Sequence, residues 1–131
     1  MPKPIYALLC DYGIYDEWRN RHSAIGLFNH FSASSFPAIF RFDVVSKWRA
    51  GEQEVQGEFM IRVAPIAGRF GVSGIVAATA PKQLTFDPFT HTAANTAHFD
   101  IQLPIEGEYQ LEFYFNNNLV HALPFFVIPD D

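Results

Sequence analysis

The sequence predicts an all-β protein, an antiparallel β-sandwich of immunoglobulin-like type with about seven to nine strands. Apolar residues recur at every second position in several runs, and proline or glycine stands between these runs. The clearest example is residues 109–115, which alternate and then meet Asn116-Asn117-Asn118. Asparagine tolerates positive φ, so this triplet predicts a hairpin turn into a closing strand that ends near Ile128.

The expected strands follow one another along a single domain, residues 1–131. They cover residues 5–14, 22–32, 38–48, 55–64, a short segment within 68–80, then 97–103, 109–115 and the closing strand. In the first run Tyr6, Leu8, Cys10 and Tyr12 share a face, and in the second Ile25, Leu27 and Phe31 do so. Residues 16–21 fit a single helical turn.

The composition and net charge limit the classes of function that fit this chain. The 131 residues include 14 phenylalanines, more aromatic surface than one sandwich interior usually needs, so some rings are expected at the surface or in an interface. The net charge is −5 and no lysines or arginines cluster, which disfavours nucleic acid and membrane as partners. The single cysteine excludes an intrachain disulfide, and Asp11 ends a short apolar run, so a cytoplasmic location is expected.

No catalytic residue, cofactor or metal site is predicted. The closest pair among the five histidines, His91 and His98, is seven residues apart, unlike the close spacing typical of metal ligands. Cys10 lies on an apolar strand face and is expected to be buried and unreactive. The spaced glycines of residues 68–74 lack the lysine of a phosphate-binding loop. Three acidic residues are expected on an outward face, where they can approach one another across strands; ordinary solvated surface is the favoured interpretation. They are Asp100, Glu108 and Glu112.

Residues 86–95 form an expected loop of about ten residues that carries Phe86, Phe89 and His91. Long loops on rigid scaffolds often carry function. The favoured interpretation is that both phenylalanines close one end of the sandwich.

Two strands are apolar on both faces, which predicts self-association. In the closing strand Phe125 and Val127 lie on one face, and Phe126 and Ile128 lie on the other. In the opening strand Leu9 lies on the face opposite to that of Leu8 and Cys10. Soluble monomers rarely expose such patches, and the simplest way to cover this one is a second copy of the chain in a homodimer. The alternative is that residues 86–95 cover the patch within one chain. The candidate contact surface comprises Leu9, Phe86, Phe89, His91, Ala122, Phe126 and Ile128.

Three sequence segments carry a resemblance to a known family. They are Ala7-Leu8-Leu9-Cys10-Asp11-Tyr12, Ile25-Gly26-Leu27-Phe28, and Gly107-Glu108-Tyr109 followed by Pro124 to Val127. With these, the chain resembles a bacterial family of unknown function whose members are short, single-domain β-sandwich proteins. The resemblance implies the fold, and it brings no catalytic residue, cofactor or substrate.

The predicted function is a non-catalytic module for protein–protein binding or structural assembly. One alternative is a carbohydrate-binding module, in which exposed rings stack on sugars, with Trp18, Trp48 and Tyr114 as the platform candidates. The other alternative is an enzyme with a cleft at one end of the sandwich.

Overall fold

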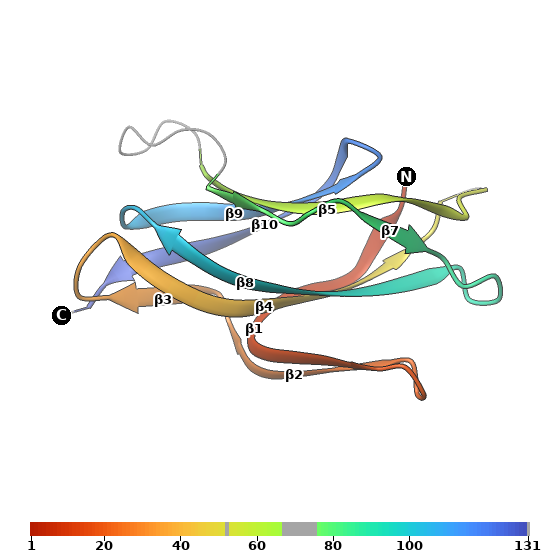
Figure 1. Cartoon of the computed structure of the whole chain (residues 1–131), viewed down its shortest axis with the longest axis horizontal. Helices are drawn as coiled ribbons and strands as arrows, with labels where there is room; N and C mark the ends of the chain where they lie inside the picture. Colours follow the sequence, from red (N-terminus) through yellow and green to blue (C-terminus); the bar gives the residue numbers. More distant parts are fainter. Residues whose placement is uncertain (52, 67–75, 131) are drawn as a thin grey trace.

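A computed structural model of the chain describes residues 1–51, 53–66 and 76–130, and these residues form two sheets (Figure 1). The first sheet has the order β2-β1-β4-β8, and the second has the order β3-β10-β9-β5-β6, with β7 also paired to β5. All the strand pairs are antiparallel except β10 with β3. The strands are β1 (Lys3–Asp16), β2 (Arg21–Phe28), β3 (His30–Ala33), β4 (Ala38–Arg49), β5 (Gln56–Pro65), β6 (Ala77–Ala78), β7 (Lys82–Thr85), β8 (Thr92–Leu103), β9 (Gly107–Phe115) and β10 (Asn118–Pro129). The predicted all-β class with two predominantly antiparallel sheets is confirmed.

The hydrophobic core lies between the two sheets and is built largely from rings. The side chain of Trp48 on β4 is fully buried, and its ring centroid lies 5.3 Å from that of Phe113 on β9. Phe42 stacks on Phe99 at 5.1 Å, and Tyr109 stacks on Phe125 at 5.7 Å. These rings lie on the apolar faces that the period-two pattern predicts for β4, β8, β9 and β10. The alternation therefore locates the core correctly in most strands.

The closing hairpin turns where the asparagines predict it. Asn116 and Asn117 have φ values of 49° and 65°, and Phe115 pairs with Asn118. Two successive left-handed residues match the twist of the flanking strands, which explains why asparagine is favoured there.

The predicted strand over residues 22–32 is wrong as a single element. The chain breaks at Asn29, so that β2 pairs with β1 in the first sheet while β3 pairs with β10 in the second. The rings of Phe28 and Phe31, which flank this break, lie 4.6 Å apart at the edge of the core. Because both rings pack into the same gap between the sheets, the chain crosses from one sheet to the other there.

Two other predictions differ from the structure, namely the start of one strand and the conformation of residues 16–21. Strand β8 begins at Thr92 rather than at residue 97, because β4 is long enough for Arg49 to pair with Thr92. The expected loop of residues 86–95 therefore ends at His91. Residues 16–21 form a hairpin turn, and the structure contains no helix in the residues it describes.

The described residues form ten strands rather than seven to nine, because residues 22–32 split in two and the short β7 escapes the periodicity. Of the predicted strand within residues 68–80, Ala77–Ala78 forms β6, and residues 67–75 lie outside the described part of the chain.

The far half of the β1–β2 hairpin folds back over the outer face of the first sheet, and Figure 1 shows it beneath β4 and β8. A Cβ atom on Gly13 would lie 2.5 Å from Cγ1 of Val45, so glycine permits this close approach. Val45, which neighbours the core residue Val44, is 1% exposed because the hairpin covers it. The chain thus adds a third layer that the sequence does not reveal.

Candidate contact surfaces and cavities

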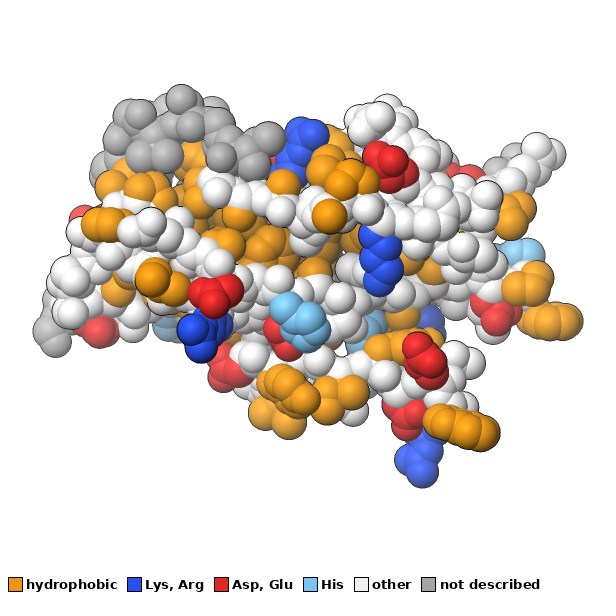
Figure 2. All heavy atoms as spheres, in the orientation of Figure 1, with side chains coloured by type: hydrophobic (Ala, Val, Ile, Leu, Met, Phe, Trp, Pro, Cys, Tyr) orange, Lys and Arg blue, Asp and Glu red, His pale blue; other side chains and the backbone are white. Residues whose placement is uncertain are grey.

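The outer side of this hairpin carries an apolar surface, the hairpin face, formed by Tyr12, Ile14, Ile25 and Leu27. Their side chains are 53%, 46%, 63% and 60% exposed, respectively. Tyr12 pairs with Ile25 across the ladder, so their side chains share one face. Figure 2 shows hydrophobic side chains gathered at the bottom of the molecule, where Figure 1 places β1 and β2. The period-two pattern assigns these residues to a core, and only the fold-back reveals their exposure.

Asp43 of β4 anchors the hairpin to the sheet from behind this face. Its Oδ2 accepts a hydrogen bond of 2.7 Å from the backbone N–H of Gly13, and its Oδ1 lies 2.6 Å from Nδ1 of His98. Asp43 is 7% exposed, so both contacts satisfy a carboxylate that is largely removed from water.

His22 of β2 provides a second polar anchor. The hydroxyl of Tyr6 contacts Nδ1 of His22, and Nε2 of His22 lies 2.8 Å from Oγ1 of Thr96. Burial, followed by the charge of Lys47, lowers the pKa of His22. A neutral ring with its proton on Nε2 accepts from Tyr6 and donates to Thr96, which satisfies both ring nitrogens. The hairpin is thereby held to β1 and β8 at once.

A smaller apolar surface, the β10 face, lies on the outer side of the second sheet. It contains three residues of the predicted contact surface, Ala122, Phe126 and Ile128, and both Phe126 and Ile128 are 42% exposed. Its cross-strand neighbours on β9 are Glu112 and Glu108, opposite Ala122 and Phe126 respectively. The surface is therefore bordered by charge.

Leu9 does not belong to any exposed surface, contrary to the prediction. It is 3% exposed and faces the core, so the outer side of β1 carries Tyr6, Leu8 and Tyr12 instead. The sequence shows two apolar faces on β1 without showing which one the second sheet covers. The hairpin itself, rather than residues 86–95, partly covers the outer one.

The other three predicted contact residues lie at one end of the sandwich. Phe86 is 3% exposed and packs against Phe115 at 5.9 Å, whereas Phe89 is 90% exposed. The expected closure of the sandwich end is therefore made by one phenylalanine, not two. His91 is exposed, with a φ of 59°.

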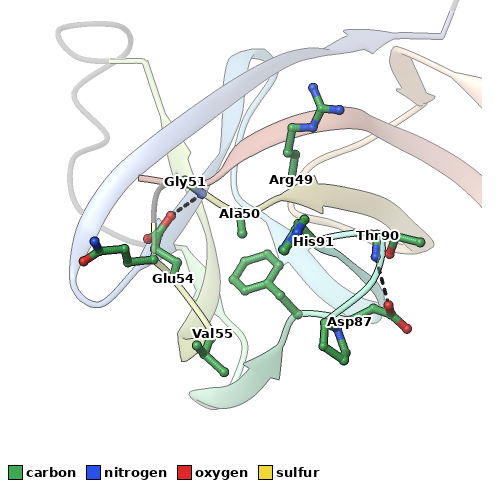
Figure 3. A pocket seen from close by; sticks show the side chains of 11 residues that line it. Arg49, Ala50, Gly51, Glu54, Val55, Asp87, Thr90 and His91 are labelled. Carbon is green, nitrogen blue, oxygen red and sulfur yellow. Dashed lines mark hydrogen bonds between the residues drawn. The ribbon is translucent and has the colours of Figure 1, made fainter.

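A cavity of about 560 Å³ opens beside these residues, between the chain that follows β4 and the turn before β8 (Figure 3). Arg49, Glu54, Asp87 and His91 line it, and Phe86 contributes an apolar wall.

Both carboxylates of the cavity already bind backbone. Asp87 accepts from the N–H groups of Thr90 and Phe89, and these hydrogen bonds lower the pKa of Asp87. Oε1 of Glu54 accepts from the N–H of Gly51 at 2.5 Å. The cavity thus resembles a stabilised loop junction more than a pair of catalytic acids.

Asp100 does not approach Glu108 and Glu112, so the alternative to an ordinary solvated surface is excluded for these three residues. Asp100 lies on β8 of the first sheet, while the two glutamates lie on β9 of the second. Asp100 instead pairs with Arg41 at 3.2 Å, and Glu112 accepts from Gln110 at 2.7 Å. The sequence places each residue outward correctly but cannot assign it to a sheet.

The three aromatic residues expected to stack on sugars do not form one exposed surface. Trp18 at the hairpin tip is 98% exposed, but Trp48 is fully buried. Tyr114 is half-buried, and the guanidinium of Arg62 lies 4.5 Å from its ring centroid. A bound sugar would have to displace that arginine to stack on this face of Tyr114.

Cys10 is fully buried, as expected from its apolar strand. Its Sγ lies 3.7 Å from the carbonyl oxygen of Asp43, and burial raises the pKa of the thiol.

Within residues 1–51, 53–66 and 76–130, no three side chains of histidine, cysteine, aspartate or glutamate are grouped to hold a metal ion. In the same residues, no helix is long and apolar enough to cross a membrane.

Comparison with known sequences identifies the family, with a match over residues 5–128. The chain belongs to the family of unknown function DUF6941. The resemblance to a family of unknown function, which the sequence suggests, is confirmed. No curated protein matches the chain.

Solved structures show a likeness of fold alone. The alkylpurine DNA glycosylase AlkC of Pseudomonas fluorescens, bound to DNA containing an abasic site analog, matches with a TM-score of 0.56 and 7% identity. The match covers 97% of this chain and 30% of the glycosylase chain. A β-glucosidase from Listeria innocua, in complex with glucose, matches at a TM-score of 0.48 and 8% identity, over 76% of this chain and 14% of the other.

Proposed function

We propose that this protein is a non-catalytic binding module that associates with a second copy of itself, with the hairpin face as the contact surface. One observation carries the proposal: four large apolar side chains are about half exposed or more on one face of a hairpin. The polar anchors at Asp43 and His22 hold that hairpin in place. A preorganised apolar surface loses little conformational entropy on binding, which favours association.

The edge of the hairpin explains why faces, rather than strand edges, are proposed to meet. β2 is the outermost strand of its sheet, but Gly26 has a φ of 71° and the carboxylate of Asp11 lies close to it. A backbone irregularity of this kind in an edge strand opposes the addition of another strand. On this hairpin, the apolar surface that remains open to a partner is therefore the hairpin face.

Charges of both signs at the hairpin tip favour a second copy as the partner. Asp16 and Glu17 lie beside Arg19 and Arg21 around the turn. A mixed rim of this kind is compatible with its own two-fold image, in which acidic and basic groups of the two copies can face each other. A typical stable interface buries about 800 Å² per partner, so the four apolar residues would form its centre and the polar tip its rim.

We also propose that the sandwich is immunoglobulin-like. Two observations support this finer assignment. β4 is flanked by β1 and β8 in one sheet, and β9 by β5 and β10 in the other. The hydroxyl of Tyr109, near the start of β9, donates to the carbonyl of Ile105 at 2.7 Å, which resembles the tyrosine corner of such domains. The lone cysteine favours a cytoplasmic setting for the module.

Light scattering on a sizing column tests the self-association at tens of micromolar protein. We expect a dimer mass for the native chain and a monomer mass for Ile25→Glu, which places a charge at the centre of the hairpin face. Ile39→Glu is the matched control, because Ile39 is 69% exposed on β4 outside both apolar surfaces. Circular dichroism verifies that each variant is folded.

A monomer mass for the native chain would contradict the proposal. Phe126→Glu separates the two apolar surfaces. Dissociation by this variant but not by Ile25→Glu would assign the contact to the β10 face instead.

A further inference from the structure

A second cavity lies between the folded-back hairpin and the outer face of the first sheet. It has a volume of about 400 Å³, within the range of small-molecule sites. Its wall includes Tyr6, Val45 and Lys47 from the sheet, and Arg21, His22 and Ala24 from the hairpin. The fold-back creates this cavity, so its residues come together from three strands.

The charged groups of the cavity wall are both cations. Arg21 and Lys47 line it, and among the residues that the structure describes no carboxylate does. Neither cation lies within ion-pair distance of an acidic group among the described residues. Asp16 is the ladder partner of Arg21, but its carboxylate binds the backbone N–H groups of Trp18 and Arg19 instead. Two such cations in a chain of net charge −5 form a local site of positive potential.

The neutral polar groups of the cavity complement these cations. Oδ1 of Asn20 accepts from the hydroxyl of Tyr15 at 3.0 Å, which leaves the amide N–H groups of Asn20 as donors. The ring of His22 hydrogen-bonds with Tyr6 and Thr96, and it brings no negative charge to the cavity. Asn20, Arg21 and Lys47 together supply donors for an anion.

The rest of the wall is apolar. Leu8, Ala24 and Val45 line the cavity, and Leu8, which is 39% exposed, offers most of its accessible apolar surface. An inorganic ion would leave these side chains without a partner, whereas an organic group would cover them. The wall therefore favours a ligand with a charged end and a compact apolar body.

We propose that this cavity binds a small organic dianion, held by Arg21 and Lys47 through its anionic groups and by Leu8 and Ala24 through its apolar body. Two uncompensated cations match two negative charges, and the guanidinium fork suits a carboxylate or a phosphate. Phosphate monoesters and dicarboxylates share this chemistry. The site is separate from the hairpin face and stands independently of the proposed dimer.

Calorimetric titration and amide chemical-shift mapping test the proposal with four probes: phenyl phosphate, phthalate, inorganic phosphate and neutral benzamide. We expect phenyl phosphate or phthalate to bind at least tenfold more tightly than inorganic phosphate or benzamide. The shifted amides should include residues 20–24 and 45–47. The better of the two organic probes distinguishes a phosphate monoester from a dicarboxylate.

Arg21→Gln and Lys47→Gln should each weaken binding at least tenfold. Arg19→Gln should leave it unchanged, since Arg19 lies on the same turn but does not line the cavity. Absence of binding at millimolar concentration, equal affinity for benzamide or inorganic phosphate, or shifts confined to other residues would overturn the proposal. The shift map of the native chain decides the matter even if a variant fails to fold.

Discussion

Oδ2 of Asp43 accepts a 2.7 Å hydrogen bond from the backbone N–H of Gly13, and this contact joins the central strand of the first sheet to the hairpin that folds over it. Gly13 also has to be a glycine, because Val45 occupies the space where a side chain would begin. The third layer, its apolar outer face and the cavity beneath it all depend on this pair of residues.

Asp43→Ala should destabilise the protein by about 2–3 kcal/mol, because it leaves the N–H of Gly13 buried without an acceptor. Asp43→Asn should cost less, since an amide oxygen can still accept from Gly13. Asp100→Ala is the control, because the ion pair of Asp100 with Arg41 is solvent-exposed and should contribute under about 1 kcal/mol. Urea denaturation measures all three, and equal losses for Asp43→Ala and Asp100→Ala would contradict the anchor.

Gly13→Ala should also destabilise, by about 1–3 kcal/mol, because its new Cβ would lie 2.5 Å from Cγ1 of Val45. Combining it with Val45→Ala removes the clash, so the two losses should not add. A double-mutant cycle by chemical denaturation measures this coupling. Strict additivity would show that the hairpin does not press on Val45.

Phe113→Ala should cost about 3–5 kcal/mol, a large part of the stability of a domain of this size. Phe113 is fully buried and packs against Trp48 and Phe59 between the sheets. Its neighbour on β9, Tyr114, points outward and is half-buried, so Tyr114→Ala is the matched control with an expected smaller loss. Similar losses for the two variants would mean that the faces of β9 are assigned wrongly.

The two tryptophans give a spectroscopic check of the hairpin tip and the core. Trp18 is 98% exposed, whereas Trp48 is fully buried and its Nε1 donates to Oγ of Ser46 at 2.9 Å. Trp18→Phe should therefore shift the fluorescence emission to shorter wavelength and remove most quenching by iodide. An unchanged spectrum would show that Trp18 is covered, for example by the partner copy in a dimer.

The sequence predicts strands well where each strand has one polar and one apolar face. β4, β8 and β9 follow this rule, and their core residues Phe42, Phe99 and Phe113 are identified correctly. The rule fails for β1 and β2, where both faces carry apolar residues. Period-two alternation cannot say whether the strand face that carries Leu9, or the one that carries Ile25, meets the core, because that depends on where the hairpin bends.

The candidate sites escape sequence reasoning for a related reason. The cavity under the hairpin combines Tyr6 with Arg21 and Lys47, residues that no short motif connects. Only the fold-back at Gly13 brings them together. By contrast, the exposure of Phe126 and Ile128 follows from strand parity alone, once Phe125 is placed in the core.

His22 should make the stability of the protein depend on pH near neutrality. Burial and the charge of Lys47 lower its pKa below the ordinary value of 6.5, so the folded state favours the neutral ring. This contribution is fully present above the unfolded value, decreases as the pH falls below about 6.5, and levels off once the pH is below the folded pKa. Protonation would also place a donor on Nδ1, facing the hydroxyl of Tyr6.

Urea denaturation of the native chain and His22→Gln between roughly pH 8 and pH 5 isolates this effect, because the other histidines are present in both proteins. His121, whose pKa is also lowered by burial, therefore cancels in the comparison. We expect the stability advantage of the native chain to shrink as the pH falls through this range. A difference that stays constant from pH 8 to pH 5 would show that His22 does not titrate as a buried, neutral anchor of the hairpin.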